Sequence, residues 1–284
     1  MNDQPGAVIA TIRSLMPSLL PTEQTVAAVL LERSAEIVEL SAQQVADAAG
    51  ASRATVVRTC QSLGYSGYQQ LRVLLARDAA AAPVRPTGAT PDGAAGIVTA
   101  TFTQLADRVH DMTALLDGEA LDRAVTLLAD ARRVVIVGNG LSAPLAQDAA
   151  ARLTSIGRPA EAQSDVIGQQ ISARLLGPGD LLLVVSGSGA NALTLRTVAA
   201  ATAAGADVVA VTAFGRSPIA QAATVALVVT MPDLTFRDEL TLASRLPQAI
   251  LVEGLVAATA DRLGDVAVRA KALALDAISA NLSD

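Results

Sequence analysis

Apolar residues recur at two different spacings along the chain, and the change between them divides the sequence into two parts. In the first part they follow helical spacing, as in Val26, Leu30 and Leu31, with Thr22 expected to cap that helix. In the second part, from about residue 134, short uninterrupted apolar runs alternate with helical stretches. Such runs are typical of strands that are buried on both faces of a sheet.

The apolar runs of the second part predict a parallel sheet. Each run is followed by a helical pattern before the next run begins. Strands that alternate with helices form parallel sheets covered on both faces, so we predict an α/β, doubly wound parallel sheet here. The predicted strands are Val134–Val137, Ala160–Gln163, Leu181–Val185, Val208–Thr212 and Val225–Thr230. From Arg245 onward the pattern is helical.

A stretch rich in proline and glycine separates the two parts. It includes Pro86 and Gly88 among many alanines. This composition disfavours regular structure and is typical of linkers. We therefore predict an N-terminal domain over residues 1–82, a linker over 83–96, and a second domain with flanking helices over 97–284.

The first part contains two short helical patterns joined by a glycine. Ser41 can cap the first helix, with Gln44 completing a capping box, and Ser52 can cap the second. Gly50 lies between them, where the chain must turn sharply with a positive φ. The inner face of the second helix consists of Val56, Cys60 and Leu63. This arrangement matches the helix-turn-helix unit, so we predict that the N-terminal domain is all-α.

The second of these helices is the predicted DNA-reading element. In a helix-turn-helix the second helix enters the major groove, and its N-terminal residues contact bases and phosphates. Between Ala51 and Arg77 the chain carries arginines but no Asp or Glu, which gives this segment a basic face. The alternative is a plain helical hairpin with a solvated basic face. The predicted DNA-binding residues are Ser52, Arg53, Thr55 and Arg58.

The overall composition narrows the function classes. The net charge is −6, so any binding to nucleic acid must rest on the local basic face. One cysteine, Cys60, and one histidine, His110, give no internal disulfide and no zinc site of the usual kinds. The apolar runs are shorter than the ~20 residues of a membrane span, and no signal-peptide pattern opens the chain. We expect a cytoplasmic protein without a membrane or metal partner.

The first predicted strand runs into the glycine-rich loop Gly138-Asn139-Gly140-Leu141-Ser142. Glycines let backbone N–H groups approach an anion at the N-terminus of the helix that follows. Gly140 and Ser142 are therefore candidate ligand contacts. The segment from Gly138 to Ala143 also fits the G-x-G-x-x-A dinucleotide fingerprint, with Glu161 at the distance of a ribose contact. A dinucleotide site is therefore an alternative.

A second loop of the same kind follows the strand predicted at Leu181–Val185. It reads Ser186-Gly187-Ser188-Gly189-Ala190-Asn191, and its hydroxyl, amide and backbone N–H groups suit a phosphate monoester. Because both loops follow neighbouring parallel strands, we expect them to form one crevice. The alternative is a pair of ordinary turns between strand and helix.

These residues resemble the RpiR-type (MurR/RpiR) transcription regulators, which join a helix-turn-helix to a sugar isomerase (SIS) domain. The resemblance extends from about Thr22 to Arg262. In the first half it is carried by Val45-Ala46, Gly50-Ala51-Ser52, Thr55-Val56-Val57-Arg58 and Leu63-Gly64-Tyr65-Ser66-Gly67-Tyr68. In the second half it is carried by Gly138-Asn139-Gly140-Leu141-Ser142, Ser186-Gly187-Ser188-Gly189, Ser217-Pro218 and Arg245.

The resemblance implies a regulator of carbohydrate metabolism that binds operator DNA and a phosphorylated sugar effector. It implies no cofactor. Helix-turn-helix proteins usually read DNA half-sites as dimers, so we expect a homodimer or homotetramer, with contacts along the apolar helices Ile97–Leu116 and the C-terminal segment. The implied effector-binding residues are Gly140, Ser142, Ser186, Ser188, Gly189 and Asn191. The family usually has Glu and then Thr or Ser where Ala190 and Asn191 stand, so the effector of this protein can differ from the usual sugar phosphate.

Two alternatives to a regulator stay open, a sugar-phosphate isomerase and a dinucleotide-binding redox sensor. Isomerase chemistry needs a general base beside the substrate. His110, Glu161, Glu239 and Glu253 are candidates, but they show no paired-carboxylate spacing. A fused DNA-binding domain favours a sensor, so we expect no catalytic residues.

Overall fold

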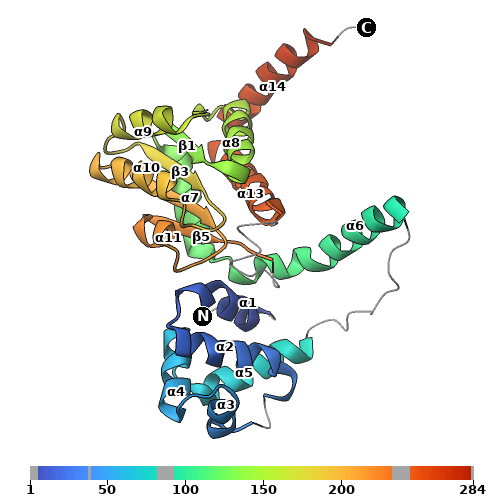
Figure 1. Ribbon diagram of the computed structural model, residues 1–284. Helices are drawn as coiled ribbons and strands as arrows, with labels where there is room; N and C mark the ends of the chain where they lie inside the picture. The colour runs from blue at the N-terminus through green and yellow to red at the C-terminus, as the bar shows by residue number, and fades with distance from the viewer. Residues whose placement is uncertain (1–5, 38–39, 82–92, 232–243, 283–284) are drawn as a thin grey trace. The chain divides into compact units, whose positions relative to one another are not determined.

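The computed structural model of the chain describes residues 6–37, 40–81, 93–231 and 244–282 (Figure 1). It comprises two compact units. One is built mainly from Met1–Leu115, and the other from Leu116–Val229 with the C-terminal helices. Of the linker predicted over residues 83–96, residues 83–92 lie outside the described residues, and residues 93–96 are helical instead, as the start of a helix that begins at Gly93.

The first unit is a helical bundle. Its helices are α1 (Ala7–Leu15), α2 (Pro21–Glu32), α3 (Ala42–Ala48), α4 (Arg53–Ser62) and α5 (Tyr68–Ala81). Their apolar faces meet in one core, which includes Ile12, Leu30, Val45, Val56, Cys60, Leu71 and Leu75. The prediction of an all-α N-terminal region is confirmed.

The start of α2 differs from the prediction that Thr22 caps it. The helix begins two residues earlier than a Thr22 cap implies, at Pro21, because the fixed φ of proline suits the first helical position. The carboxylate of Glu23 accepts a hydrogen bond from the Leu20 N–H at 3.1 Å. Its other oxygen accepts one from the Ser62 hydroxyl at 3.0 Å, which ties α2 to the end of α4.

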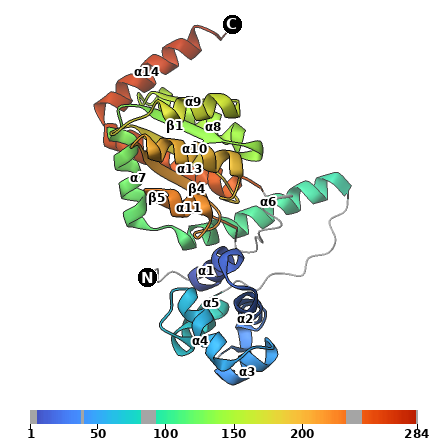
Figure 2. The same ribbon diagram turned by 60° about the vertical axis from the view of Figure 1, so that its left-hand side comes forward.

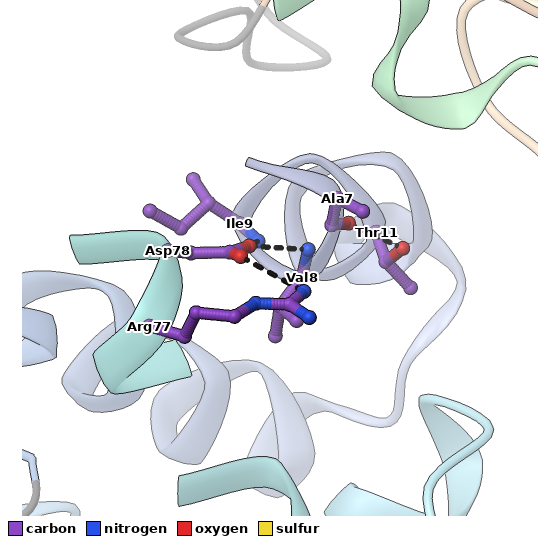
Figure 3. A network of polar contacts seen from close by, with 6 residues as sticks. All are labelled: Ala7, Val8, Ile9, Thr11, Arg77 and Asp78. Atoms are coloured by element: carbon purple, nitrogen blue, oxygen red, sulfur yellow. Dashed lines mark hydrogen bonds and ion pairs between the residues drawn. The ribbon is translucent and has the colours of Figure 1, made fainter. Parts of the chain in front are cut away.

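A buried carboxylate near the end of α5 holds α1 in place. Asp78, near the end of α5, is 1% exposed. Its Oδ2 accepts hydrogen bonds from the N–H groups of Val8 at 2.7 Å and Ile9 at 3.4 Å (Figure 3). Its Oδ1 pairs with the guanidinium of Arg77 at 3.3 Å. Asp78 thus supplies the N-terminal cap that α1 lacks locally, since Gly6 precedes the helix.

Beyond the linker, the first unit continues into α6 (Gly93–Met112) and a short 3-10 turn, Thr113–Leu115. Ala114 of this turn packs against Ala7 and Ala10 of α1. The large apolar side chains that α6 exposes to solvent are Ile97, Val98, Phe102 and Val109.

The second unit contains a five-stranded, all-parallel sheet of order β2-β1-β3-β4-β5. The central strands are buried along their whole length, as their uninterrupted apolar runs predicted. The doubly wound α/β prediction is confirmed. The strands are β1 (Val134–Gly138), β2 (Ala160–Ala162), β3 (Leu181–Val185), β4 (Asp207–Thr212) and β5 (Val225–Val228).

Helices cover both faces of this sheet (Figures 1 and 2). On one face α13 packs between α7 and α8, and on the other α10 packs between α9 and α11. This division follows from right-handed crossovers that leave the middle of the sheet in opposite directions. The helices are α7 (Gly118–Asp130), α8 (Ala143–Ser155), α9 (Val166–Arg174), α10 (Ala192–Ala203), α11 (Pro218–Ala222) and α13 (Leu246–Leu263).

The helical segment predicted from Arg245 consists of two helices. They break at Gly264, whose φ of 53° lies in the left-handed region that suits glycine. The second, α14 (Asp265–Ser279), buries Ala267 but leaves most of its apolar residues in solvent. Exposed apolar residues on α14 and just after it include Val268, Leu273, Leu275, Ile278 and Leu282.

Within the described ranges, no helix is both long enough and apolar enough to span a bilayer.

Candidate functional site

The two predicted ligand loops lie together at one edge of the sheet. Strands β1 and β3 are adjacent and parallel, with Gly138 opposite Val185 at their carboxyl ends. From β1 the chain crosses to β2, and from β3 it crosses to β4 on the other side. This reversal is a topological switch point, where open α/β sheets bind their ligands. We call Gly138–Ser142 loop 1 and Ser186–Asn191 loop 2.

Loop 1 turns tightly into α8. Gly140 has a φ of 58° and is exposed. A Cβ on Gly138 would lie 2.5 Å from the carbonyl oxygen of Ser142, so the loop closes on this glycine. Ser142 stands at the N-cap position of α8, but its side chain makes no capping hydrogen bond and is 3% exposed. Its part in ligand binding stays a prediction.

Loop 2 is held rigidly by β4 and α11. The N–H of Ser186 donates to Val211 O at 3.0 Å, and the N–H of Gly189 donates to Ser186 O at 3.1 Å. Gly189 has a φ of 60°, and a Cβ there would lie 2.0 Å from Ser217 Oγ. The N–H groups of Gly187, Ser188 and Asn191 have no hydrogen-bond partner among the described residues. Loop 2 is therefore a fixed turn with free donors.

Asn191 caps the helix that follows loop 2. Its Oδ1 accepts hydrogen bonds from the N–H groups of Leu193 at 3.0 Å and Thr194 at 3.1 Å. The predicted start of this helix at Leu193 is close to the observed start at Ala192. Asn191 is exposed, and its amide nitrogen has no hydrogen-bond partner among the described residues.

Sequence reasoning missed three polar residues that join the two loops. Asn139 of loop 1 donates through Nδ2 to Thr194 Oγ1 at 2.9 Å and to Gln169 Oε1 at 3.1 Å. Gln169 of α9 is fully buried and donates to the carbonyl oxygens of Gly138 and Gln163. Asn139 lies inside a recognised glycine loop and could have been found. Gln169 and Thr194 carry no sequence signal, because their partners come from other elements.

Glu161 does not serve the dinucleotide site that the fingerprint suggested. Its carboxylate accepts a hydrogen bond from Arg133 Nε at 2.5 Å. Arg133 immediately precedes β1, so this carboxylate is held toward the amino end of the strand, and loop 1 follows the carboxyl end. Because Glu161 is paired with Arg133, it gives the dinucleotide alternative no support.

Of the other candidate bases, only Glu253 has a described side chain. Glu253 of α13 pairs with Arg152 of α8 at 2.9 Å. Glu239 and the side chain of His110 lie outside the described residues. In the part of the chain that the structure describes, no cluster of three or more His, Cys, Asp or Glu residues could hold a metal ion.

The helix-turn-helix of the first unit has the predicted local geometry. Ser41 Oγ accepts from the Gln44 N–H at 3.2 Å, and Gln44 Oε1 accepts from the Ser41 N–H at 2.8 Å, which completes the capping box. Gly50 turns the chain with a φ of 61°. Ser52 Oγ caps α4 through the Thr55 N–H at 3.1 Å.

The four predicted DNA-binding residues lie in the first two turns of α4, but they differ in freedom. Arg53 is exposed and has no hydrogen bond or ion pair among the described residues. Thr55 is 8% exposed, and its hydroxyl contacts Ser52 Oγ at 2.9 Å and Arg58 Nη2 at 3.3 Å. Arg58 is thus an exposed guanidinium steadied by its own helix.

Cys60 lies on α4 and faces the core of the helical bundle. It is fully buried, and burial raises the pKa of its thiol to about 12 from an ordinary value of 9.0. The thiol is therefore neutral and packs as a small apolar group.

A chain that joins a helix-turn-helix unit to an all-parallel α/β unit has the make-up of a DNA-binding regulator, and comparison with known proteins identifies its family. The helix-turn-helix domain of the rpiR family matches residues 6–82, and the SIS domain matches residues 127–252. The HTH-type transcriptional regulator HexR of Pseudomonas aeruginosa is 32% identical over 90% of this chain and 90% of its own. The chain belongs to the rpiR family of transcriptional regulators.

Two further proteins share parts or all of this architecture. The bifunctional protein glk of Paraburkholderia xenovorans is 32% identical over 90% of this chain, which corresponds to 40% of that larger protein. The structure of Vibrio vulnificus NanR complexed with ManNAc-6P covers 97% of this chain and 100% of its own, with a TM-score of 0.62 and 24% identity. The likeness to NanR shows that the whole fold is shared.

Proposed function

We propose that this protein regulates genes of carbohydrate metabolism, that α4 binds operator DNA, and that the crevice between loops 1 and 2 binds a phosphorylated sugar. The observation that carries the proposal is loop 2. It presents free N–H groups of Gly187, Ser188 and Asn191, with the Ser188 hydroxyl beside them. Successive backbone N–H groups in a turn form anion-binding nests that suit phosphate. NanR, which has the same fold, was solved with ManNAc-6P.

The effector contacts that we propose come from both loops. Loop 2 supplies Ser186, Ser188, Gly189 and Asn191, and loop 1 supplies Gly140 and Ser142. On the DNA side, Arg53 and Arg58 reach the bases, while Ser52 and Thr55 support them and the phosphate backbone. A regulator of this kind acts in the cytoplasm, where its DNA lies.

A sensor fits the crevice better than an enzyme. Isomerisation needs a base within hydrogen-bond reach of the substrate. Among the described residues, the carboxylates considered for that role, Glu161 and Glu253, are paired with arginines away from the loops. We therefore propose that the effector is bound and released unchanged.

We further propose that the protein works as a homodimer or homotetramer. Helix α6 exposes apolar residues at helical spacing, among them Val98, Phe102 and Val109, and α14 exposes a similar set. Solvent-facing apolar stripes of this size mark protein contacts. Light scattering should show an oligomer at micromolar concentration, and a monomer there would contradict the proposal.

The function is tested by combining effector and DNA measurements. A thermal-shift screen of phosphorylated sugars, with ManNAc-6P included and NAD as control, identifies a stabilising compound. That compound should change the affinity of the wild-type protein for operator DNA. The double variant Ser186→Ala, Ser188→Ala should bind DNA normally but lose this response, whereas Ser155→Ala, an exposed serine on α8, should keep it.

Two outcomes would overturn this account. A double variant that still responds like the wild type would place the effector elsewhere. Turnover of a sugar phosphate by the purified protein would favour the isomerase alternative.

A further inference from the structure

The polar side chains between loops 1 and 2 form one hydrogen-bonded chain, and backbone groups fix its direction at both ends. At the first end Asn191 faces the N–H groups of Leu193 and Thr194. Backbone N–H groups can only donate, so the Asn191 oxygen must face them. At the second end Gln169 faces the carbonyl oxygens of Gly138 and Gln163, which can only accept. The nitrogen of Gln169 must therefore face those carbonyls.

The two fixed ends determine the residues between them. The Thr194 hydroxyl has a single hydrogen, which it donates to Asn191 Oδ1 at 3.3 Å. It must therefore accept from Asn139 Nδ2, which lies 2.9 Å away. The second Nδ2 hydrogen of Asn139 goes to Gln169 Oε1 at 3.1 Å. Every hydrogen of the Asn139 amide is thus used inside the protein.

This leaves two free amide atoms of opposite character, one at each loop. Asn139 is half-buried in loop 1, and its Oδ1 has no hydrogen-bond partner among the described residues and is not sealed from solvent. That oxygen can only accept. Asn191 is exposed at loop 2, and its Nδ2 is likewise unpartnered among the described residues. That nitrogen can only donate.

We propose that these two atoms set the orientation of the effector in the crevice. Asn191 Nδ2 donates to a phosphate oxygen, and Asn139 Oδ1 accepts from a sugar hydroxyl. A phosphate monoester offers acceptors and a hydroxyl offers a donor, so the reverse orientation leaves both amide atoms unsatisfied. Thr194 and Gln169 are positioning residues that keep the amides turned this way. The inference rests on the proposed function and adds Asn139 to the effector contacts.

The phosphate end is tested with Asn191→Asp. Aspartate caps a helix as well as asparagine, so the melting temperature should not fall, but its carboxylate repels phosphate. Affinities for inorganic phosphate and ManNAc-6P, followed by 31P NMR and calorimetry, should both fall by about tenfold or more. Asn191→Ser, which can cap and still donate, should stay within about threefold of the wild type. Asp117→Asn at the α7 cap is the matched control and should change neither affinity.

The sugar end is tested with Asn139→Ala and the milder Asn139→Ser. Each should lower the affinity for ManNAc-6P by about tenfold and the affinity for inorganic phosphate by less than about twofold. Thr194→Val should lower the affinity for ManNAc-6P by about threefold, because the Asn139 amide loses one of its two hydrogen bonds. Thr194→Ser keeps the hydroxyl and should retain the wild-type affinity. A melting curve for each variant separates loss of fold from loss of binding.

The outcomes separate this inference from the proposed function. If the wild-type protein binds no phosphorylated sugar in the screen, the proposed function fails. If it binds one, either of two results overturns the inference alone. The first is that Asn191→Asp binds phosphate with wild-type affinity. The second is that the Asn139 variants lose affinity for inorganic phosphate and for ManNAc-6P by the same factor. ManNAc-6P is replaced by the tightest compound of the screen if that differs.

Discussion

The helix that we propose reads DNA and the two loops that we propose bind the effector are built in contrasting ways. On α4 the functional side chains are neighbours in sequence, and Ser52, Thr55 and Arg58 support one another within two turns of one helix. In the crevice, Asn139, Gln169 and Thr194 come from three elements and meet only because β1 and β3 are adjacent. The effects of variants on α4 should therefore stay within that helix, whereas variants at the two loops should disturb contacts between several elements.

The largest effect is expected from Gly189→Ala in loop 2. A Cβ at this position meets Ser217 Oγ at 2.0 Å, and the positive φ adds strain. We expect the second unit to lose about 3 kcal/mol of stability and the protein to lose its effector response. Calorimetric melting measures the first, and DNA binding with and without the effector measures the second.

The control for this variant is Gly254→Ala on α13, where a Cβ meets nothing within 4 Å. It should leave stability unchanged or raise it by about 0.5–1 kcal/mol, since alanine favours helix. Equal melting temperatures for the Gly189 and Gly254 variants would show that loop 2 is not the rigid turn described.

Asp78→Ala should have the next largest effect, on the first unit. It leaves the N–H groups of Val8 and Ile9 buried without their acceptor. We expect a loss of about 2 kcal/mol in the free energy of unfolding, measured with urea. The comparable loss for Asp117→Ala, an exposed cap on α7, should be about 1 kcal/mol. A smaller loss at Asp78 than at Asp117 would contradict the capping role of the buried carboxylate.

On the DNA-reading face, Arg53→Ala and Arg58→Ala should each weaken operator binding by about 1–3 kcal/mol without changing the melting temperature. Arg33→Ala, whose guanidinium pairs with Glu36 outside α4, should bind DNA normally. Fluorescence anisotropy at fixed salt measures the affinities. Unchanged binding in both α4 variants would remove α4 as the reading helix.

The smallest effect concerns Cys60. Its thiol pKa is raised to about 12, so the folded protein keeps its proton above the ordinary value of 9.0 while the unfolded chain loses it. Stability from this group is therefore full below about pH 9 and falls as the pH rises toward 12. At pH 8 a thiol reagent should react slowly with the folded protein and rapidly in denaturant. Rapid reaction of the folded protein would mean that Cys60 is accessible.

The same contrast explains which features could be predicted from the sequence. Both caps, the glycine turn and the inner face of α4 follow from local spacing, and the structure confirms them. The sheet and the adjacency of loops 1 and 2 also followed, because parallel strands with short loops have few possible orders. The pairing of Glu161 with Arg133 did not follow, because it depends on how β2 lies against β1.

Other features depend on packing that local sequence does not encode. Asp78 caps a helix 70 residues away in the chain, and nothing near it indicates that role. Gln169 and Thr194 look like ordinary helix residues until the fold places them beside Asn139. The break at Gly264 was readable from its glycine, but the pattern around it stays helical on both sides.

The central claim is that free backbone donors of loop 2 receive the phosphate of a sugar effector. Hydrogen–deuterium exchange with and without the sugar phosphate that stabilises the protein tests it most directly. The account predicts slower exchange in peptides covering residues 186–191 and 138–142. Protection confined to other parts of the chain, with these two loops unchanged, would contradict it.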